Sequence, residues 1–183
     1  MKTILVTGGA RSGKSSFAEK LTMSAANQAL YVATAQAFDQ EMKERIALHQ
    51  QQRAEADYPW ETVEECYDLP GLLDRLSGSK TVLVDCLTLW LSNILLSVES
   101  DEHRQEVVEQ EISRLEQSVM AFSGTLIMVT NEVGDGIVPE YALGRLYRDL
   151  AGRMNQRLAR QCSQVFLVTA GIPIELKSRE YLL

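Results

Sequence analysis

Five short apolar runs predict the buried strands of this chain. Each consists mainly of aliphatic or β-branched side chains, and they lie at residues 3–7, 29–33, 81–85, 125–130 and 165–169. Such runs, without alternating polar positions, are typical of parallel strands that are covered on both faces. A sixth run, at residues 60–65, does alternate apolar and polar positions, which predicts a strand close to an edge of the sheet.

Between these runs, apolar residues recur at helical spacing. The pattern predicts helices at residues 16–21, 38–54, 69–76, 87–96, 101–122 and 140–161. Asp101 is the expected cap of the fifth of these helices. After the last apolar run, a tail without a further strand is expected from Gly171 onward. Strands that alternate with helices predict an α/β fold of three layers, with a mainly parallel central sheet, formed by one domain of residues 1–183.

The turn between the first strand and the first helix carries a specific motif. Residues 8–15 match G-x-x-x-x-G-K-[ST], the phosphate-binding loop (P-loop). In this context the backbone N–H groups and the helix N-terminus face one anion, which predicts a P-loop NTPase-like fold. We expect an exposed Lys14 to reach the outer phosphates and the Ser15 hydroxyl to ligate Mg²⁺. The predicted nucleotide-binding residues of the loop are Gly8, Gly9, Ala10, Arg11, Ser12, Gly13, Lys14 and Ser15.

Asp85 ends one of the apolar strands, which is the Walker B position of a P-loop sheet. An aspartate at the end of a strand is common and often has no special role. With a P-loop upstream in the same sheet, however, a metal role is favoured. The sequence therefore predicts that Ser15 and Asp85 hold Mg²⁺.

His49 is one of only two histidines, and it lies between Arg45 and Arg53 at intervals of four residues. On a helix these three side chains share one face. The two cations disfavour a charged imidazole, and a neutral imidazole is a nucleophile that could attack phosphorus. A solvated polar helix face explains the same spacing, so both interpretations stay open. The other histidine, His103, is expected to be exposed and structural.

Five arginines recur on the long helix at residues 140–161. They could meet a phosphorylated substrate or a neighbouring subunit, or form a solvated face with acidic neighbours. These arginines are Arg145, Arg148, Arg153, Arg157 and Arg160.

Charge and composition narrow the class of partner and the compartment. The net charge is −7, which disfavours nucleic acid as a partner. The three cysteines have no zinc or redox spacing and fit a reducing compartment. No apolar run is long enough to span a membrane, and the first run meets Gly8 too early to form a signal peptide. A cytoplasmic protein that acts on small molecules is expected.

The block at residues 129–139, Val-Thr-Asn-Glu-Val-Gly-Asp-Gly-Ile-Val-Pro, is much more specific than the P-loop motif, which alone would identify only a superfamily. Its combination with His49 is equally specific, and further characteristic segments lie at residues 6–15, 31–35, 148–156 and 170–173. By these segments the whole chain resembles the bifunctional adenosylcobinamide kinase/adenosylcobinamide-phosphate guanylyltransferases of cobalamin biosynthesis.

The resemblance implies two reactions on one chain. ATP or GTP phosphorylates the hydroxyl of adenosylcobinamide, and GMP is then transferred from GTP to that phosphate through a covalent GMP–histidine. By motif position the histidine is His49, and His49 and Lys14 are the expected catalytic residues. The resemblance also implies a homotrimer. Beyond the P-loop, it assigns nucleotide contacts to Ala33, Thr34, Ala35, Gln50, Gln51, Gln52, Arg53, Glu64 and Asp85.

Two alternatives remain. One is a single-function P-loop kinase of another small molecule, in which His49 is structural. The other is a GTPase-like switch, which is disfavoured because the guanine-reading sequence Asn-Lys-x-Asp is absent and Asp85 is not followed by the glycine of a D-x-x-G switch.

Overall fold

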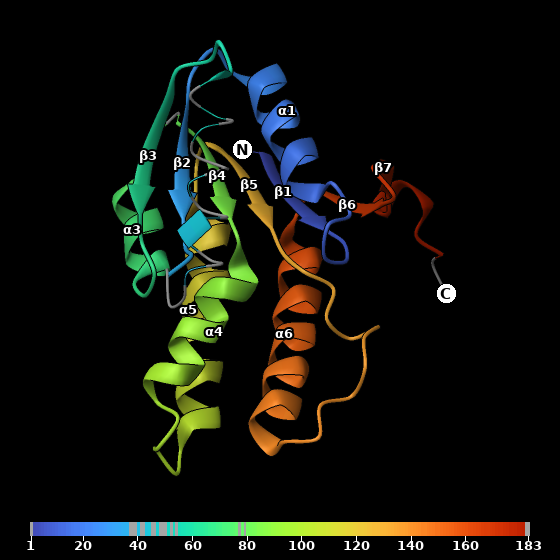
Figure 1. Cartoon of the computed structure of the whole chain (residues 1–183). Coiled ribbons are helices and arrows are strands. Elements are labelled where there is room, and N and C mark those ends of the chain that lie inside the picture. Colours follow the sequence, from blue (N-terminus) through green and yellow to red (C-terminus); the bar gives the residue numbers. More distant parts are fainter. Residues whose placement is uncertain are drawn as a thin grey trace.

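The computed structural model describes residues 2–36, 40, 43, 44, 47, 51, 53, 55–76, 78 and 80–181. A seven-stranded sheet of order β3-β2-β4-β5-β1-β6-β7 lies at its centre, with β3 and β7 at opposite edges (Figure 1). All neighbouring strands from β3 to β6 pair in parallel, and β7 pairs antiparallel with β6. The strands are β1 (Lys2–Thr7), β2 (Ala29–Ala33), β3 (Trp60–Glu64), β4 (Thr81–Asp85), β5 (Thr125–Val129), β6 (Gln164–Thr169) and β7 (Ile172–Glu175).

Helices cover both faces of the sheet because the buried strands are apolar on both sides. Leu5, Val84 and Met128 belong to one core cluster, which includes side chains of α3, α4, α5 and α6. Their sequence neighbours Ile4 and Leu83 belong to a second cluster, which includes side chains of α1. The helices are α1 (Lys14–Ala25), α3 (Leu69–Arg75), α4 (Leu87–Ser97), α5 (Arg104–Ala121), α6 (Ala142–Gln161) and the 3₁₀ helix η1 (Lys177–Arg179).

This architecture confirms the prediction of a three-layer α/β fold with a mainly parallel sheet. The predicted strands at residues 29–33 and 81–85 coincide with β2 and β4, and the alternating run forms the edge strand β3. Most of the helix predicted at residues 38–54 lies outside the described residues.

Two local expectations are wrong. The tail contains β7, a four-residue strand that is mostly exposed and includes Pro173, so it lacks the apolar signal of the buried strands. α5 begins after His103, and the Asp101 carboxylate accepts a hydrogen bond from the His103 N–H at 2.7 Å. Asp101 therefore stabilises the turn before α5 and does not cap the helix itself.

Candidate functional site

The P-loop connects β1 to α1 and requires glycine at two positions. A Cβ atom on Gly8 would lie 2.4 Å from the Val168 carbonyl oxygen, so any larger residue would collide with the backbone of β6. Gly13 has a φ of +93°, in the left-handed region that glycine adopts most readily. Both glycines are thus needed for the loop to turn closely against β6 and enter the helix.

Lys14 is buried rather than exposed, which corrects the sequence expectation. Its side chain folds back over the loop, and Nζ donates a hydrogen bond to the Gly9 carbonyl oxygen at 3.0 Å. A buried ammonium group needs acceptors, and the loop's own backbone supplies one. The lysine is therefore held at the loop by a bond within the protein itself.

Neighbouring strands end at the same end of the sheet, and this brings several predicted residues together. Ala33 lies in register with Glu64 on one side and with Asp85 on the other. Asp85 is also paired with Val129, which in turn is paired with Val6 just before the P-loop. The carboxyl ends of β3, β2, β4, β5 and β1 therefore lie side by side, at the end of the sheet where open α/β proteins bind ligands. This carboxyl end of the sheet is called the P-loop edge below.

A polar cluster on the α1 side of the sheet connects Asp85 with three other parts of the chain. The Arg53 guanidinium lies 3.7 Å above the centre of the Tyr31 ring, and its Nη1 lies 3.8 Å from Glu19 Oε1. The Tyr31 hydroxyl donates a hydrogen bond to Asp85 Oδ2 at 3.2 Å. Trp60 packs edge-on against Tyr31, with ring centroids 5.9 Å apart. Tyr31 and Glu19 were missed by sequence reasoning because only the fold brings them to Asp85.

The protonation of this cluster follows from its burial. Burial raises the pKa of the Glu19 carboxyl, and the nearby Arg53 opposes that shift. Burial and the adjacent Asp85 raise the pKa of the Tyr31 phenol far above its usual range. Tyr31 therefore stays protonated at physiological pH and can serve as a stable donor to Asp85.

Three buried side-chain atoms within the described residues lack a hydrogen-bond partner, and all three belong to this region. They are Thr7 Oγ1, Ser12 Oγ and Arg53 Nη1. Unsatisfied buried polar groups are rare in folded proteins because each costs free energy. The two hydroxyls at the P-loop are suited to binding an anion, whereas Arg53 Nη1 already has the Glu19 carboxylate 3.8 Å away.

Other predicted residues lie elsewhere or outside the description. His49, Gln50 and Gln52 are outside the described residues. Gln51 is exposed, and its amide donates a hydrogen bond to Glu55 at 2.8 Å. The His103 side chain is 74% exposed, as expected.

Three of the arginines of α6 form the following bonds within the chain. Arg153 pairs with Glu109 at 2.7 Å, and the Arg157 guanidinium bonds to Glu116. Arg148 donates to the Gly134 carbonyl oxygen. For Arg153 and Arg157, the structure thus favours the interpretation as a helix face with acidic neighbours.

The segment after β5, which resembles the family most strongly, adjoins the P-loop. The Glu132 N–H donates to the Gly8 carbonyl oxygen at 3.1 Å. The Asn131 amide donates to Thr88 Oγ1 at 2.8 Å, and the Asn155 amide donates to the Asn131 carbonyl oxygen at 3.1 Å. Sequence reasoning assigned no role to Thr88, a polar residue within an apolar helix pattern, or to Asn155, which lies in a segment that matches the family.

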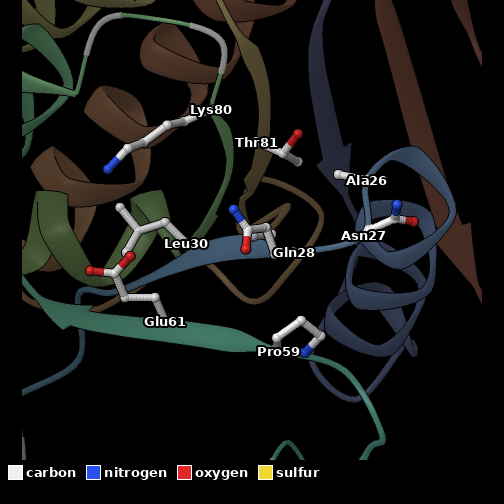
Figure 2. Close-up of a pocket in the computed structure, with 9 residues that line it drawn as sticks. Ala26, Asn27, Gln28, Leu30, Pro59, Glu61, Lys80 and Thr81 are labelled. Carbon is white, nitrogen blue, oxygen red and sulfur yellow. The ribbon is translucent and has the colours of Figure 1, made fainter.

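A separate cavity of about 340 Å³ opens at the amino ends of the strands, at the end of the sheet opposite the P-loop (Figure 2). Its wall includes the first residues of β2 and β4, and Glu61 of β3. The P-loop and Asp85 lie at the carboxyl ends of the strands, so this cavity is not part of the candidate site. Figure 2 shows Lys80 and Glu61 at its rim.

Two further kinds of feature are absent from the described residues. No group of three or more histidine, cysteine, aspartate or glutamate residues among them could hold a metal ion. None of their helices is both long and apolar enough to cross a membrane.

Comparison with known proteins identifies close relatives. The family model described as cobinamide kinase/cobinamide phosphate guanyltransferase matches residues 4–176. The bifunctional adenosylcobalamin biosynthesis protein CobU of Escherichia coli K12 is 43% identical, over 95% of this chain and 99% of that protein. CobP of Pseudomonas aeruginosa is 42% identical, over 94% and 96%. CobU of Salmonella typhimurium is 40% identical, over 95% and 99%.

Solved structures with a similar fold are much more distant in sequence. A protein of Pyrococcus horikoshii OT3 aligns with a TM-score of 0.51 at 12% identity, over 95% of this chain and 85% of that one. An ATPase of a bacterial type III secretion system aligns with a TM-score of 0.52 at 11% identity, over 100% of this chain and 59% of that one. These two likenesses show the fold alone.

Proposed function

The chain belongs to the cobinamide kinase/cobinamide phosphate guanylyltransferase family, and we propose that it performs both reactions named there. In the first, the hydroxyl oxygen of adenosylcobinamide attacks the γ-phosphorus of ATP or GTP, and the nucleoside diphosphate leaves. In the second, GMP passes from GTP to the new phosphate, which gives adenosylcobinamide-GDP and pyrophosphate.

The observation that carries the proposal is the presence of two buried hydroxyls at the P-loop that have no hydrogen-bond partner. Thr7 and Ser12 each contribute one of them. Phosphoryl transfer depends mainly on positioning and on neutralising charge, so donors gathered around a phosphate site suit this chemistry. Lys14, already held at the loop, adds a positive charge there.

Mg²⁺ fits the same edge, and we assign it to Ser15 and Asp85. Magnesium in such sites takes one or two protein oxygens together with phosphate oxygens, so a cluster of acidic residues is not required. Both side chains are half-buried and not sealed within the core. When bound, Mg²⁺ would neutralise charge on the phosphates, while Tyr31 orients the Asp85 carboxylate by its hydrogen bond to Oδ2. The remaining nucleotide contacts are assigned to residues 33–35, 50–53 and 64, and within them the buried Thr34 acts by holding Ala33 and Ala35 in place.

The guanylyl step is assigned to His49 as the nucleophile. A neutral imidazole nitrogen attacks the α-phosphorus of GTP and expels pyrophosphate, and the phosphate of the acceptor then attacks the same phosphorus and releases the histidine. Arg53 supports this assignment because it follows His49 by four residues and lies in the polar cluster that includes Asp85. Four residues of chain span at most about 14 Å, which keeps a nucleophile at position 49 within reach of the site.

A product analysis tests the double function. Purified protein with Mg²⁺, GTP and adenosylcobinamide should yield first adenosylcobinamide phosphate and then adenosylcobinamide-GDP, followed by mass spectrometry over time. ATP alone should give only the phosphate. If the reaction with excess GTP ends at the phosphate, the chain is a single-function kinase. If neither product forms, the proposed activity is wrong.

We further propose that the chain assembles as a homotrimer in the cytoplasm. Large apolar side chains are exposed between β5 and α6, including Ile137 at 95% and Tyr141 at 68%. Exposed apolar surface of this kind is typical of protein interfaces. The three cysteines are free thiols, as expected in a reducing compartment.

Light scattering at micromolar protein concentration checks the assembly. The expected mass is about three times 20.5 kDa. A monomeric mass in a sample that retains full activity would contradict the trimer, whereas the proposed chemistry would stand.

A further inference from the structure

Asn93 joins the loops that follow two neighbouring strands. It lies in α4, only 3% of its surface is exposed, and its single amide nitrogen makes two hydrogen bonds. Nδ2 donates to the Thr34 carbonyl oxygen at 2.9 Å and to the Cys66 carbonyl oxygen at 3.1 Å. Thr34 directly follows β2, and Cys66 lies two residues after the end of β3. The amide group of one side chain thus holds both loops, with one hydrogen bond to each.

Thr34 is bound from the other side by β4. Its N–H donates to the Asp85 carbonyl oxygen at 3.3 Å. Its hydroxyl donates to the Cys86 carbonyl oxygen at 2.7 Å and accepts from the Cys86 N–H at 2.9 Å. Thr34 is fully buried, and its N–H, hydroxyl and carbonyl groups all bond within the protein. Its role in the site is therefore to hold the half-exposed Ala33 and Ala35, which flank it.

The two loops are separated from the P-loop by several strands of the sheet. In the order β3-β2-β4-β5-β1, three strand spacings separate β2 from β1, or about 14 Å. A ligand that contacts both the P-loop and these loops must be extended. Its phosphates lie at the P-loop, so the loops after β2 and β3 meet its other end.

We propose that Asn93 is a positioning residue for the nucleoside end of the bound nucleotide. It sets the positions of residues 33–35 and 64–66 relative to each other without contacting the nucleotide itself. This inference rests on the proposed function, which assigns nucleotide contacts to these two loops. Neither aspartate nor leucine can supply these two bonds: aspartate would place oxygens against two carbonyl oxygens, and leucine would leave both carbonyls unpaired.

Binding of two ligands, GTP and inorganic tripolyphosphate, separates this role from a general loss of structure. Both contain the triphosphate that the P-loop recognises, and only GTP carries a nucleoside. Calorimetry with Mg²⁺ would compare the wild type with Asn93→Asp and Asn93→Leu, with GTP supplied as its α,β-methylene analogue because GTP itself would transfer its GMP to His49. We expect the Kd for GTP to rise about tenfold or more in both variants. The Kd for tripolyphosphate should stay within about twofold of the wild-type value, because the P-loop is unchanged.

Leu115→Ala is the control for lost stability. Leu115 is fully buried in α5, and its truncation changes no hydrogen bond of the two loops. This variant should melt at a lower temperature yet bind both ligands as the wild type does. If the Asn93 variants are too unstable, Thr34→Val loosens the same loop from the β4 side and should give the same selective loss of GTP affinity.

The outcomes are distinct. Folded Asn93 variants that bind GTP with wild-type affinity would overturn the positioning role, as would an equal loss of both ligands. A wild-type protein that binds neither ligand would overturn the proposed function instead.

Discussion

Replacing Lys14 by alanine is expected to lower the rates of both reactions by about a hundredfold to a thousandfold, while the protein stays folded. The ammonium group is held at the P-loop, where negative charge develops on the transferred phosphate. Removing one such preorganised donor typically costs about 3–4 kcal/mol of transition-state stabilisation. The fold should tolerate the change because Gly9 is exposed and its carbonyl oxygen still accepts a hydrogen bond from the Ser12 N–H at 3.3 Å.

Steady-state rates of phosphate and pyrophosphate release, with circular dichroism of each protein, measure this effect. Lys20→Ala is the matched control, since Lys20 lies on the same helix, is exposed, and is six residues further from the loop. Lys14→Ala with near-normal rates would remove Lys14 from the mechanism.

The fold was largely predictable because its signals are local. A buried strand such as β4 needs a continuous apolar run, and the P-loop needs a glycine at each point where the chain must turn. β7 gave no comparable signal, because an exposed edge strand that contains Pro173 is held by pairing with β6 rather than by burial.

The site was predictable only in part. The alignment of Ala33 with Glu64 and Asp85 depends on strand order, which local patterns do not specify. Asn93 lies within an apolar helix pattern, and nothing in that pattern indicates the two carbonyl groups that it meets. Burial of Lys14 likewise follows from how the loop folds and not from its motif.

Replacing His49 by asparagine should separate the two reactions. The guanylyl transfer should fall below detection, since it requires the nucleophile. Phosphorylation of adenosylcobinamide should continue at near the wild-type rate, because that step needs only the P-loop, Mg²⁺ and the acceptor. His103→Asn is the matched control: His103 is the only other histidine, its side chain is exposed, and both activities should survive its loss. Loss of both reactions in a folded His49→Asn protein would contradict separate roles for His49 and the P-loop.

The covalent intermediate is the central claim, and intact-mass spectrometry tests it most directly. The wild-type protein, incubated with GTP and Mg²⁺ but no acceptor, should gain the mass of one GMP and release pyrophosphate. The bond should be labile in acid and stable in alkali, as a phosphoramidate is and an acyl phosphate on Asp85 would not be. The adduct should be absent from His49→Asn and present in His103→Asn. If no adduct forms at any GTP concentration, or if it persists in His49→Asn, the two-step mechanism is wrong for this chain.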